Sequence, residues 1–476
     1  MRRVWRVRGQ GEPMDATTGS QPRIAALRAL LEDVHAKLKP GFGFRLWDGS
    51  LVPAAWPAEG LVITIADPGA VAKLVRRPRL DTLIKLHVDG RLDLAGGSFF
   101  DLVAARPTGK PGRLLRGISK RRVLAVIRHF FFVPQGPASV LDPVKGDAIA
   151  RDGSEATNRT NVAYHYDVSN DFYELFLDPE MVYTCAYFAD DHMDLARAQA
   201  DKLDMICRKL RLQPGERFLD IGSGWGALVC HAAKHYGVEA HGVTLSSEQL
   251  ALAREKAQMR GIADRVTFHF KDYRAMEGTF DKIASIGMFE QVGIRNHGDY
   301  FATMNRLLRP GGLYLHHCIA RRAKRSDKRF LKMSPEYRAL VRYIFPGGEL
   351  DHLGMSISNL ERAGFEIHDV EGWREHYRRT TYLWWERLAA RRDEAEQLVG
   401  PEKVRMWLLY LAGCSLAFAR GGAYINQTLT SKRIKGDRGH ADLPVPLSRA
   451  DLYSGDTRGS DRSSPVAAQP ATSRSP

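Results

Sequence analysis

A glycine-rich segment, Asp220 to Gly226, has the residue types and spacing most informative about chemistry. It reads Asp-Ile-Gly-Ser-Gly-Trp-Gly and lies between an apolar run typical of a strand and a helical pattern. Gly222, Gly224 and Gly226 allow the backbone to turn sharply and to approach a ligand closely. Doubly wound sheets bind ligands at the carboxyl ends of their strands, where this loop would lie. The sequence therefore predicts a ligand-binding loop here rather than an ordinary turn.

The spacing of these glycines excludes two common nucleotide sites. A dinucleotide fingerprint reads G-x-G-x-x-G and has an acidic residue at the end of the next strand, whereas the next strand here ends at Thr244. A Walker loop requires Gly-Lys-Ser/Thr, which this segment lacks. Asp220-x-Gly222-x-Gly224 instead resembles the first motif of class I methyltransferases, which bind S-adenosylmethionine.

This resemblance implies a set of cofactor-binding residues. The loop backbone would hold the methionine part, Thr244 and Gln249 would lie beside the ribose, and Asp272 would face the adenine. The alternative for Gln249 is a side chain that points to solvent, because a Gln on a helix is usually exposed. The residues assigned to the cofactor are Tyr183, Thr184, Asp220, Gly222, Gly224, Thr244, Gln249 and Asp272.

Segments outside this common core must identify the methyl acceptor. They are His165 to Pro179, Tyr183 to Phe188, Ser285 to Gly293, Tyr343 to Gly348 and His376 to Trp385. Together they resemble cyclopropane-fatty-acyl-phospholipid synthases and the related mycolic acid cyclopropane synthases, almost continuously from Asn161 to Lys432. The resemblance implies methyl transfer to a cis double bond in an unsaturated acyl chain of a membrane phospholipid. Loss of a proton from the added methyl group then closes a cyclopropane ring.

In that family the base is a bicarbonate ion, which the protein holds in a cage of side chains and backbone. By motif match the cage consists of Cys185, Glu290, His317, the backbone of Ile319, and Tyr377. Glu290 would accept the bicarbonate hydroxyl proton, and His317, Tyr377 and the Cys185 segment would donate to the bicarbonate oxygens. A carboxylate repels an anion, so these donors must offset Glu290. No metal-ligating set is indicated.

Three of the cage residues also have a structural alternative. Cys185 could be a small buried hydrophobe, Glu290 a residue at a helix start, and His317 a hydrogen-bonded core histidine. The adjacent His316 leaves the histidine assignment open by one position, although strand alternation favours His317 because it shares a face with Leu313 and Leu315. Gln291 stands where relatives often have His, which puts the finer tuning for substrate in doubt.

The chemistry also needs a channel without water, because methyl transfer to an alkene leaves a carbocation. Aromatic faces stabilise a cation by roughly 0.5 to 2 kcal/mol each and exclude water. The candidates, taken only as a group because a single aromatic is more often core, are Tyr183, Phe188, Phe289, Tyr343, Phe345 and Tyr377.

The elements that position these residues follow from periodicity. Strands are expected at 217–221, 238–243, 266–270, 282–286 and 313–317, with helices at 227–236 and 248–260 and a helical stripe from Leu195 to Leu210. Alternating strands and helices of this length predict the α/β class, with a doubly wound, Rossmann-like methyltransferase sheet. This domain is expected to span 161–440, after a linker at 134–160 rich in Pro, Gly, Asp and Ser.

A smaller α+β domain is expected at 23–133, resembling the lipid-binding domain of the phospholipid-acting relatives in its layout and in Val88 to Leu94. Its pattern predicts a helix from Ile24 to Leu38 and strands around Phe44, at 61–65, and on both sides of the Asp89-Gly90 turn, from Leu86 to Leu94. The ends, 1–22 and 441–476, are predicted to be disordered because their composition offers little apolar surface to bury.

The net charge of +15 suggests a polyanionic partner, either nucleic acid or an anionic membrane. No nucleic-acid motif is present, and the run Met406 to Ala419 is too short to span a bilayer. The basic amphipathic segment Arg113 to Phe132 fits either a helix lying on an anionic phospholipid surface or a core-packing helix with a solvated basic face. Five cysteines without a C-x-x-C spacing fit a reducing cytosol.

The leading hypothesis is therefore a cytoplasmic enzyme, peripheral on the inner face of the membrane, that forms cyclopropane rings in phospholipids. A lipid methyltransferase making methyl-branched chains and a small-amine N-methyltransferase are the enzymatic alternatives. A non-enzymatic lipid- or RNA-binding protein is the third, although intact Asp220, Glu290 and Tyr377 argue against it. Whether the protein forms a homodimer is left open.

Overall fold

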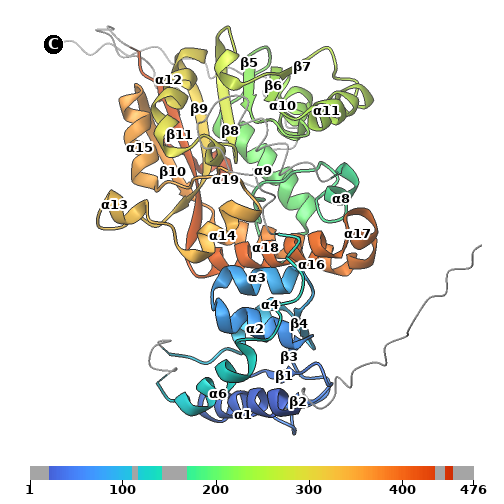
Figure 1. The fold of residues 1–476 in the computed structure, drawn as a ribbon. Coiled ribbons are helices and arrows are strands. Elements are labelled where there is room, and N and C mark those ends of the chain that lie inside the picture. Colours follow the sequence, from blue (N-terminus) through green and yellow to red (C-terminus); the bar gives the residue numbers. More distant parts are fainter. Residues whose placement is uncertain (1–20, 110–115, 142–168, 435–444, 454–476) are drawn as a thin grey trace, which may run out of the picture.

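The chain forms two units, a small one at residues 21–141 and a large one at 169–453, drawn one above the other in Figure 1. The computed structural model describes residues 21–109, 116–141, 169–434 and 445–453. The predicted linker from 142 onward, residues 161–168 of the predicted catalytic domain and nearly all of the N-terminal tail lie outside the described residues.

The large unit is built on a seven-stranded sheet in the order β10-β11-β9-β8-β5-β6-β7. β7, β6, β5, β8 and β9 are parallel neighbours, whereas β11 pairs antiparallel with both β9 and β10. The strands are β5 (Arg217–Ile221), β6 (Glu239–Thr244), β7 (Val266–Phe270), β8 (Phe280–Ile286), β9 (Leu308–Arg321), β10 (Phe365–Gly372) and β11 (Ala423–Lys432). The doubly wound, Rossmann-like sheet predicted from the sequence is confirmed, with β10 and β11 as antiparallel additions.

Helices cover both faces of this sheet because both faces of its strands are apolar. Leu203, Leu228 and Ala253 pack on one face, and Tyr300 and Leu360 on the other. The helices involved are α9 (Leu195–Lys209), α10 (Ala227–Tyr236), α11 (Ser247–Met259), α12 (His297–Leu307) and α15 (Leu353–Arg362). α9 begins where the Asp194 carboxylate accepts the N–H of Arg197, and α10 lies between Gly226 and Gly237.

The remaining elements of the large unit lie outside these helix layers. A pair of long helices, α16 (Arg374–Ala390) and α18 (Pro401–Ala419), forms its lower border in Figure 1. The shorter elements are α8 (Asn170–Glu174), η1 (Tyr273–Ala275), η2 (Phe289–Gln291), η3 (Ile294–Asn296), α13 (Asp327–Phe330), α14 (Pro335–Tyr343), α17 (Arg392–Val399) and α19 (Ala450–Tyr453). Within the described ranges, no helix combines the length and apolarity needed to cross a bilayer.

α19 corrects the prediction of a disordered tail from residue 441. Leu452 is 1% exposed and belongs to the same core as α16 and α18, and Val445 is also buried. Two apolar residues in a polar stretch gave no periodic signal. Residues 454–476 and 435–444 lie outside the described residues.

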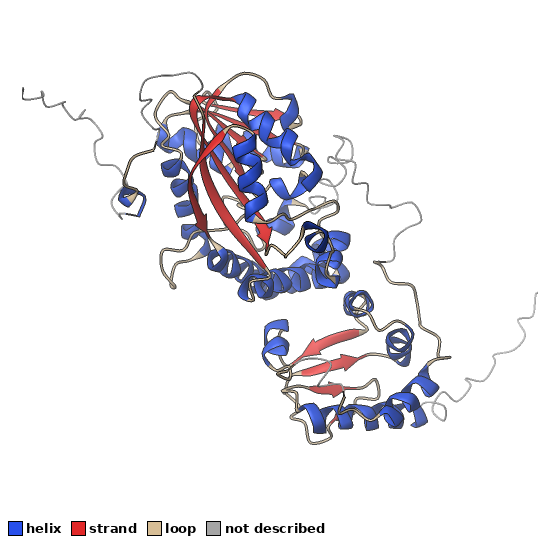
Figure 2. Ribbon diagram, turned by 90° about the vertical axis from the view of Figure 1, so that its left-hand side faces the viewer, coloured by secondary structure: helices blue, strands red, loops and turns tan. Residues whose placement is uncertain are grey.

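The small unit is a four-stranded sheet in the order β2-β1-β3-β4, covered by helices (Figure 2). Its elements are α1 (Gln21–Leu38), β1 (Gly43–Arg45), β2 (Leu51–Val52), β3 (Val62–Ile65), α2 (Pro68–Arg76), α3 (Leu80–Val88), β4 (Leu92–Ala95), α4 (Phe99–Ala104) and α6 (Lys120–Phe130). The strand predicted around Leu86 and Val88 is wrong, because these residues end α3 and only Leu92–Ala95 is a strand. Leu86 packs into the core of the small unit and Val88 packs against Tyr343 and Met406, so a helix buried on two sides has the apolar spacing of a strand.

The Val88 to Leu94 segment lies where the two units meet. Val88 packs with Tyr343 and Met406 of the large unit, and Asp93 is 3.7 Å from the Arg405 guanidinium. Phe100 of α4 contacts the ring of Trp385 edge-on, with ring centroids 4.9 Å apart. Both apolar and charged contacts thus join the small unit to α14, α16 and α18.

Candidate functional site

The glycine loop follows β5 and turns into α10, as the sequence predicts. The N–H groups of Gly222 and Ser223 both donate to the Val243 carbonyl at 3.0 Å, which ties the loop to β6. Gly222 has φ +79°, and a Cβ at this position would come within 2.8 Å of the Met288 side chain. Only glycine fits both this conformation and this space.

A cavity opens at this loop, at the carboxyl ends of β5, β6 and β8. All eight residues that the sequence assigned to the cofactor line it: Tyr183, Thr184, Asp220, Gly222, Gly224, Thr244, Gln249 and Asp272. Segments far apart in the sequence thus meet at one edge of the sheet, as the switch-point rule for doubly wound folds requires. Further lining residues that the sequence analysis did not single out include Met181, Lys202, Trp225, Met288 and Val292.

Thr244 and Gln249, the two residues predicted to lie beside the ribose, are hydrogen-bonded to each other. The Thr244 hydroxyl donates to Gln249 Oε1 at 2.9 Å, and Gln249 is buried rather than pointing to solvent. Asp272 is also buried, and its two oxygens accept from the Arg274 guanidinium at 2.9 Å each. A carboxylate has further lone pairs, so Asp272 can still accept a hydrogen bond in the cavity.

A buried lysine lies beside the acid of the motif. Lys202 of α9 is 2% exposed, and its ammonium donates to Thr184 Oγ1 at 2.8 Å. Burial lowers its pKa to about 8, against the opposing charges of Asp178 and Asp220. Burial raises the pKa of Asp220 to about 7 although Lys202 acts in the opposite direction, and Asp220 Oδ1 has no hydrogen-bond partner among the described residues. The cavity therefore offers an acceptor that lacks its donor.

The sequence analysis missed Lys202, although a signal was present. Lys202 and Lys209 lie seven residues apart on the face of α9 that also carries Leu195, Leu203 and Ile206. A lysine in the apolar stripe of a helix is rarely buried without a partner. That position indicated an internal polar site beside the sheet.

Glu290 and Ile319, both assigned to the bicarbonate cage, bond to each other. The Ile319 N–H donates to Glu290 Oε1 at 2.6 Å. The Ile319 N–H thus holds the carboxyl group of Glu290, and the assignment of the Ile319 backbone to the cage stays a prediction. Glu290 Oε2 is buried without a partner among the described residues. Burial, with a smaller effect of Asp351, raises the pKa of Glu290 to about 7.

The two neighbouring histidines of β9 point to opposite faces of the sheet. His316 packs against Phe289 and Phe301, and its Nδ1 is 2.9 Å from the Tyr314 hydroxyl. His317 lies edge-on to Trp373 with a centroid distance of 5.5 Å, on the face that carries Leu313 and Leu315, as the alternation predicts. Burial first, then the charges of Lys202 and Lys209, hold the pKa of His317 well below its usual range.

Cys185 and Tyr377 lie on the same side of the sheet as His317. Cys185 is fully buried, and its thiol donates to the carbonyls of Ala186 at 3.3 Å and Trp373 at 3.9 Å. Burial raises the pKa of this thiol, which argues against a nucleophilic thiolate. Tyr377 of α16 belongs to the same core as Cys185 and Trp373, and Ile319 packs against that core.

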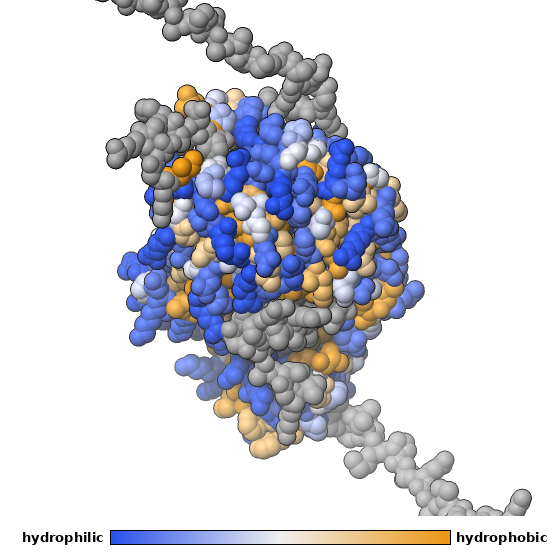
Figure 3. All heavy atoms as spheres, turned by 90° about the horizontal axis from the view of Figure 1, so that it is seen from above, coloured by the Kyte–Doolittle hydropathy of each residue, from blue (hydrophilic) through white to orange (hydrophobic). Residues whose placement is uncertain are grey.

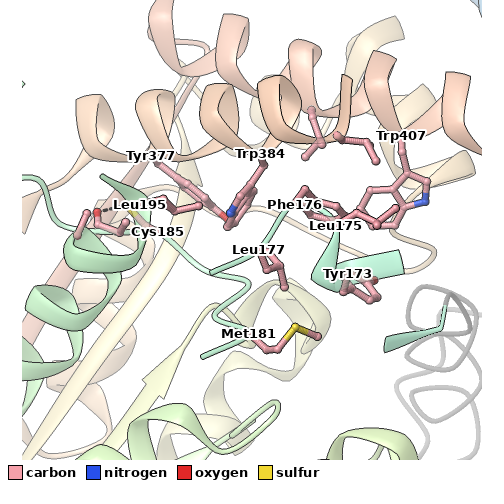
Figure 4. Close-up of a cluster of buried hydrophobic side chains, with 14 of the residues drawn as sticks. Tyr173, Leu175, Phe176, Leu177, Met181, Cys185, Leu195, Tyr377, Trp384 and Trp407 are labelled. Atoms are coloured by element: carbon pink, nitrogen blue, oxygen red, sulfur yellow. Dashed lines mark hydrogen bonds between the residues drawn. The ribbon is translucent and has the colours of Figure 1, made fainter. Parts of the chain in front are cut away.

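We define the aromatic cluster as Tyr173, Phe176, Tyr183, Trp384 and Trp407. Figure 4 shows Tyr377, Trp384 and Trp407 projecting from the two long helices toward the segment with Phe176, Leu177 and Met181. Tyr183 joins the cluster to the cofactor cavity, because it lines the cavity and lies 5.0 Å from the Trp384 ring. The cluster thus borders the cavity on one side.

The six aromatic residues predicted as a group do not form one. Tyr183, Phe188 and Tyr377 belong to the core of the aromatic cluster, whereas Tyr343 and Phe345 pack with Val88 at the contact between the two units. Phe289 lies on the other side of the sheet, 4.1 Å from the His297 ring. Phe172, Trp384 and Trp407, which the sequence analysis did not include, belong to that same core. Gln291 lines the cofactor cavity.

Comparisons with known proteins give a family for residues 153–428 and relatives that extend over most of the chain. A family model described as mycolic acid cyclopropane synthetase matches residues 153–428. A probable fatty acid methyltransferase from Pseudomonas putida is 36% identical over 433 residues, which cover 90% of this chain and 100% of that protein. The cyclopropane-fatty-acyl-phospholipid synthase of Escherichia coli (strain K12) is 38% identical over 271 residues, covering 57% of this chain and 67% of that protein.

Solved structures agree with these sequence relatives. The cyclopropane synthase MmaA2 from Mycobacterium tuberculosis matches with a TM-score of 0.55 at 33% identity, covering 58% of this chain and 98% of that chain. The mycolic acid cyclopropane synthase CmaA1, solved with SAH and CTAB, has a TM-score of 0.54 at 33% identity, with the same coverage. The chain therefore belongs to the mycolic acid cyclopropane synthetase family and is an S-adenosylmethionine-dependent methyltransferase that acts on the acyl chains of lipids.

Proposed function

We propose that this enzyme transfers the methyl group of S-adenosylmethionine to the cis double bond of an unsaturated phospholipid acyl chain and closes a cyclopropane ring. One observation supports this most strongly. Glu290 Oε2 and His317 Nε2 are buried polar atoms without partners among the described residues. Both residues are held at the same stretch of β9, because Glu290 is bonded to the N–H of Ile319. Buried polar atoms without partners are rare in folded proteins unless a ligand satisfies them.

The cavity residues fit S-adenosylmethionine as the methyl donor. The glycine loop permits close approach of a ligand, because a side chain at Gly222 would occupy the space in front of Met288. The buried Asp220 Oδ1 suits the cationic amino group of the methionine part, which would supply the missing donor. A cation beside this carboxyl group would also lower the pKa of Asp220.

The cage residues fit a bicarbonate ion. Bound bicarbonate would supply the base that removes a proton from the added methyl group. Glu290 Oε2 would accept the hydroxyl proton of that base, and His317 would donate to one of its oxygens. The buried ammonium groups of Lys202 and Lys209 make the potential at His317 positive, which offsets the repulsion between Glu290 and an anion.

The aromatic cluster would hold the acyl chain and keep water out. Its members come from α8, from the segment containing Tyr183, and from α16 and α18, and they bury an apolar region next to the cofactor cavity. Water would capture the carbocation as an alcohol, so exclusion of water determines the product. Each aromatic face near the charge stabilises it by roughly 0.5 to 2 kcal/mol.

A second product, a methyl-branched chain, is favoured by a specific observation. The Pseudomonas putida relative and one from Mycobacterium tuberculosis, which cover 90% and 88% of this chain, are both described as probable fatty acid methyltransferases. The carbocation would be the same, and only its fate would differ. The bicarbonate cage favours proton loss from the new methyl group, which gives the ring.

Analysis of lipids from cells expressing the enzyme separates these products. We expect phospholipid acyl chains to gain one CH₂ by mass spectrometry and to elute as cyclopropane chains in gas chromatography. Elution as methyl-branched chains would favour the second product. Unchanged lipids, with the enzyme present and able to bind S-adenosylmethionine, would contradict the proposed acceptor.

We also propose that α6 docks the enzyme on an anionic phospholipid bilayer. One face of α6 packs into the small unit through Val126 and Phe130, whereas Leu124 on the helix and Phe132 just after its end are 65% and 87% exposed. Exposed Arg121 flanks the outer apolar face, an arrangement typical of interfacial helices. The face in Figure 3, at the end of the molecule opposite α6, is mostly hydrophilic.

A further inference from the structure

A row of polar residues, Gln427, Lys209 and the partly exposed Glu371, lies behind His317 and does not line the cofactor cavity. Strand register places Glu371 of β10 opposite Gln427 of β11, and Gln427 opposite His317 of β9. Gln427 Nε2 is 2.9 Å from His317 Nδ1, and Lys209 Nζ donates to Gln427 Oε1 at 2.7 Å. Lys209 is also paired with Glu371. Lys209 and Gln427 are each 1% exposed.

The chemistry of Lys209 determines which way the Gln427 amide faces. An ammonium group has only donors, so the amide oxygen must face Lys209 and the amide NH₂ must face His317. The reverse orientation would place two donors against each other and would leave the amide oxygen against His317. Glu371, and the Trp373 ring 5.2 Å away, keep the ammonium group in place.

The direction of the amide determines the tautomer of His317. Because the amide NH₂ donates to Nδ1, Nδ1 must be the acceptor nitrogen, and a neutral imidazole then has its proton on Nε2. His317 Nε2 is buried and has no hydrogen-bond partner among the described residues. The lowered pKa of His317, caused mainly by burial, keeps the ring neutral.

We infer that Lys209 and Gln427 are positioning residues that hold His317 as the Nε2–H tautomer, so that its ring donates a hydrogen bond to an anionic base in the active site. This inference rests on the proposed bicarbonate cage. With the opposite tautomer, Nε2 would present a lone pair to the anion and repel it. Lys209 thus determines the direction of the Gln427 amide, and the amide determines which nitrogen of the His317 ring is protonated.

Gln427→Glu tests this inference with almost no change in shape. The new carboxylate has acceptors on both sides, so it can still pair with Lys209 but forces His317 to carry its proton on Nδ1. Nitrogen-15 NMR of histidine-labelled enzyme, with His317→Asn used to assign the ring, reports which nitrogen is protonated. We expect Nε2–H in the wild type and Nδ1–H in Gln427→Glu.

The kinetic expectation is a loss specific to bicarbonate. Replacing a donor by a lone pair against an anion should raise the bicarbonate concentration for half-maximal rate by roughly 10- to 100-fold. The KM for S-adenosylmethionine should stay within about twofold, because neither Lys209 nor Gln427 lines the cofactor cavity. Lys209→Met, which frees the amide to turn, should give a mixture of tautomers and an intermediate loss.

Thr430→Val is the matched control, since Thr430 is a fully buried β11 residue bonded to the Tyr314 carbonyl instead of His317. It should leave the tautomer and the bicarbonate dependence unchanged. An Nδ1–H tautomer in the wild type, or a swapped tautomer with unchanged bicarbonate dependence, would overturn the inference while the cage stands. A wild-type enzyme whose rate ignores bicarbonate would instead overturn the proposed cage, whatever the tautomer.

Discussion

Glu290 and Ile319 are joined by a 2.6 Å hydrogen bond from the Ile319 N–H to Glu290 Oε1. The bond fixes the carboxyl group against β9 and leaves Oε2 as its only open oxygen. Burial of this carboxyl group penalises its charged form, which is why the pKa of Glu290 rises to about 7. Under the proposed function, the burial that would prepare Oε2 for bicarbonate therefore costs stability.

Glu290→Gln should abolish most of the activity and leave cofactor binding intact. The amide oxygen is kept by the Ile319 N–H, so the amide NH₂, which is only a donor, takes the place of Oε2 and cannot accept a hydrogen bond from the bicarbonate hydroxyl group. We expect kcat to fall by roughly 10²- to 10⁴-fold. Calorimetry should show wild-type affinity for S-adenosylmethionine, because Glu290 does not line that cavity. Full activity in this variant would contradict the cage.

The same variant should be more stable than the wild type at alkaline pH. The pKa of Glu290 is about 7 when folded against an ordinary value of 4.5, so the folded state binds more protons between these pH values. Wild-type stability therefore falls as pH rises from 4.5 to 7, and the loss persists above 7. Glu290→Gln lacks this loss and should gain up to about 3 kcal/mol at pH 8 and almost nothing at pH 4.

Thermal melts at these two pH values measure the difference. Glu255→Gln on the exposed face of α11 is the control and should shift the melting temperature equally at both. A gain for Glu290→Gln that is the same at pH 4 and pH 8 would contradict the raised pKa.

Gly222→Ala should abolish binding of S-adenosylmethionine. The new Cβ would lie 2.8 Å from Met288 Cβ in a left-handed conformation, so the loop must shift. Gly215→Ala separates this local effect from backbone strain, because Gly215 has φ +81° with open space around its Cβ position and does not line the cavity. Calorimetry should show lost binding for the first variant and normal binding for the second. Normal binding by Gly222→Ala would remove the loop from the site.

Lys202→Met should make cofactor binding depend on pH. Lys202 lowers the pKa of Asp220, so its removal should raise that pKa further and leave more of the carboxyl group protonated at pH 7. A protonated Asp220 binds a cationic ligand poorly, so affinity should fall at pH 7 and recover toward pH 9. Lys282→Met, at a buried lysine paired with Glu216 away from the cavity, is the control. Equal affinity at both pH values would show that Lys202 does not act through Asp220.

The sequence predicted the parts of the site that depend on local rules. The loop at Gly222 and the helix after it follow from residue type and spacing, and so does the face occupied by His317. Lys202 left a signal in the apolar stripe of its helix, but Gln427 and the hydrogen bond between Ile319 and Glu290 could not be predicted in the same way, because they depend on the register between strands and on loop packing. Gln427 in particular lies on β11, which joins the sheet from more than 100 residues beyond His317.

α6 should bind anionic vesicles through its exposed face. Leu124 and Phe132 would enter the interface, while Arg121 and Arg128 would each contribute about 1 kcal/mol near an anionic surface. Replacing both arginines by Ser should therefore weaken binding by about 30-fold, and Leu124→Glu with Phe132→Glu should weaken it further. Activity on detergent-dispersed lipid should stay at the wild-type level, because α6 lies in the small unit and none of these residues lines the cavity.

Met259→Glu, at an apolar residue 70% exposed on α11, is the matched control and should bind vesicles normally. Co-sedimentation at low and high salt measures all of these, and wild-type binding that is equal on neutral and anionic vesicles would show that charge does not direct the docking.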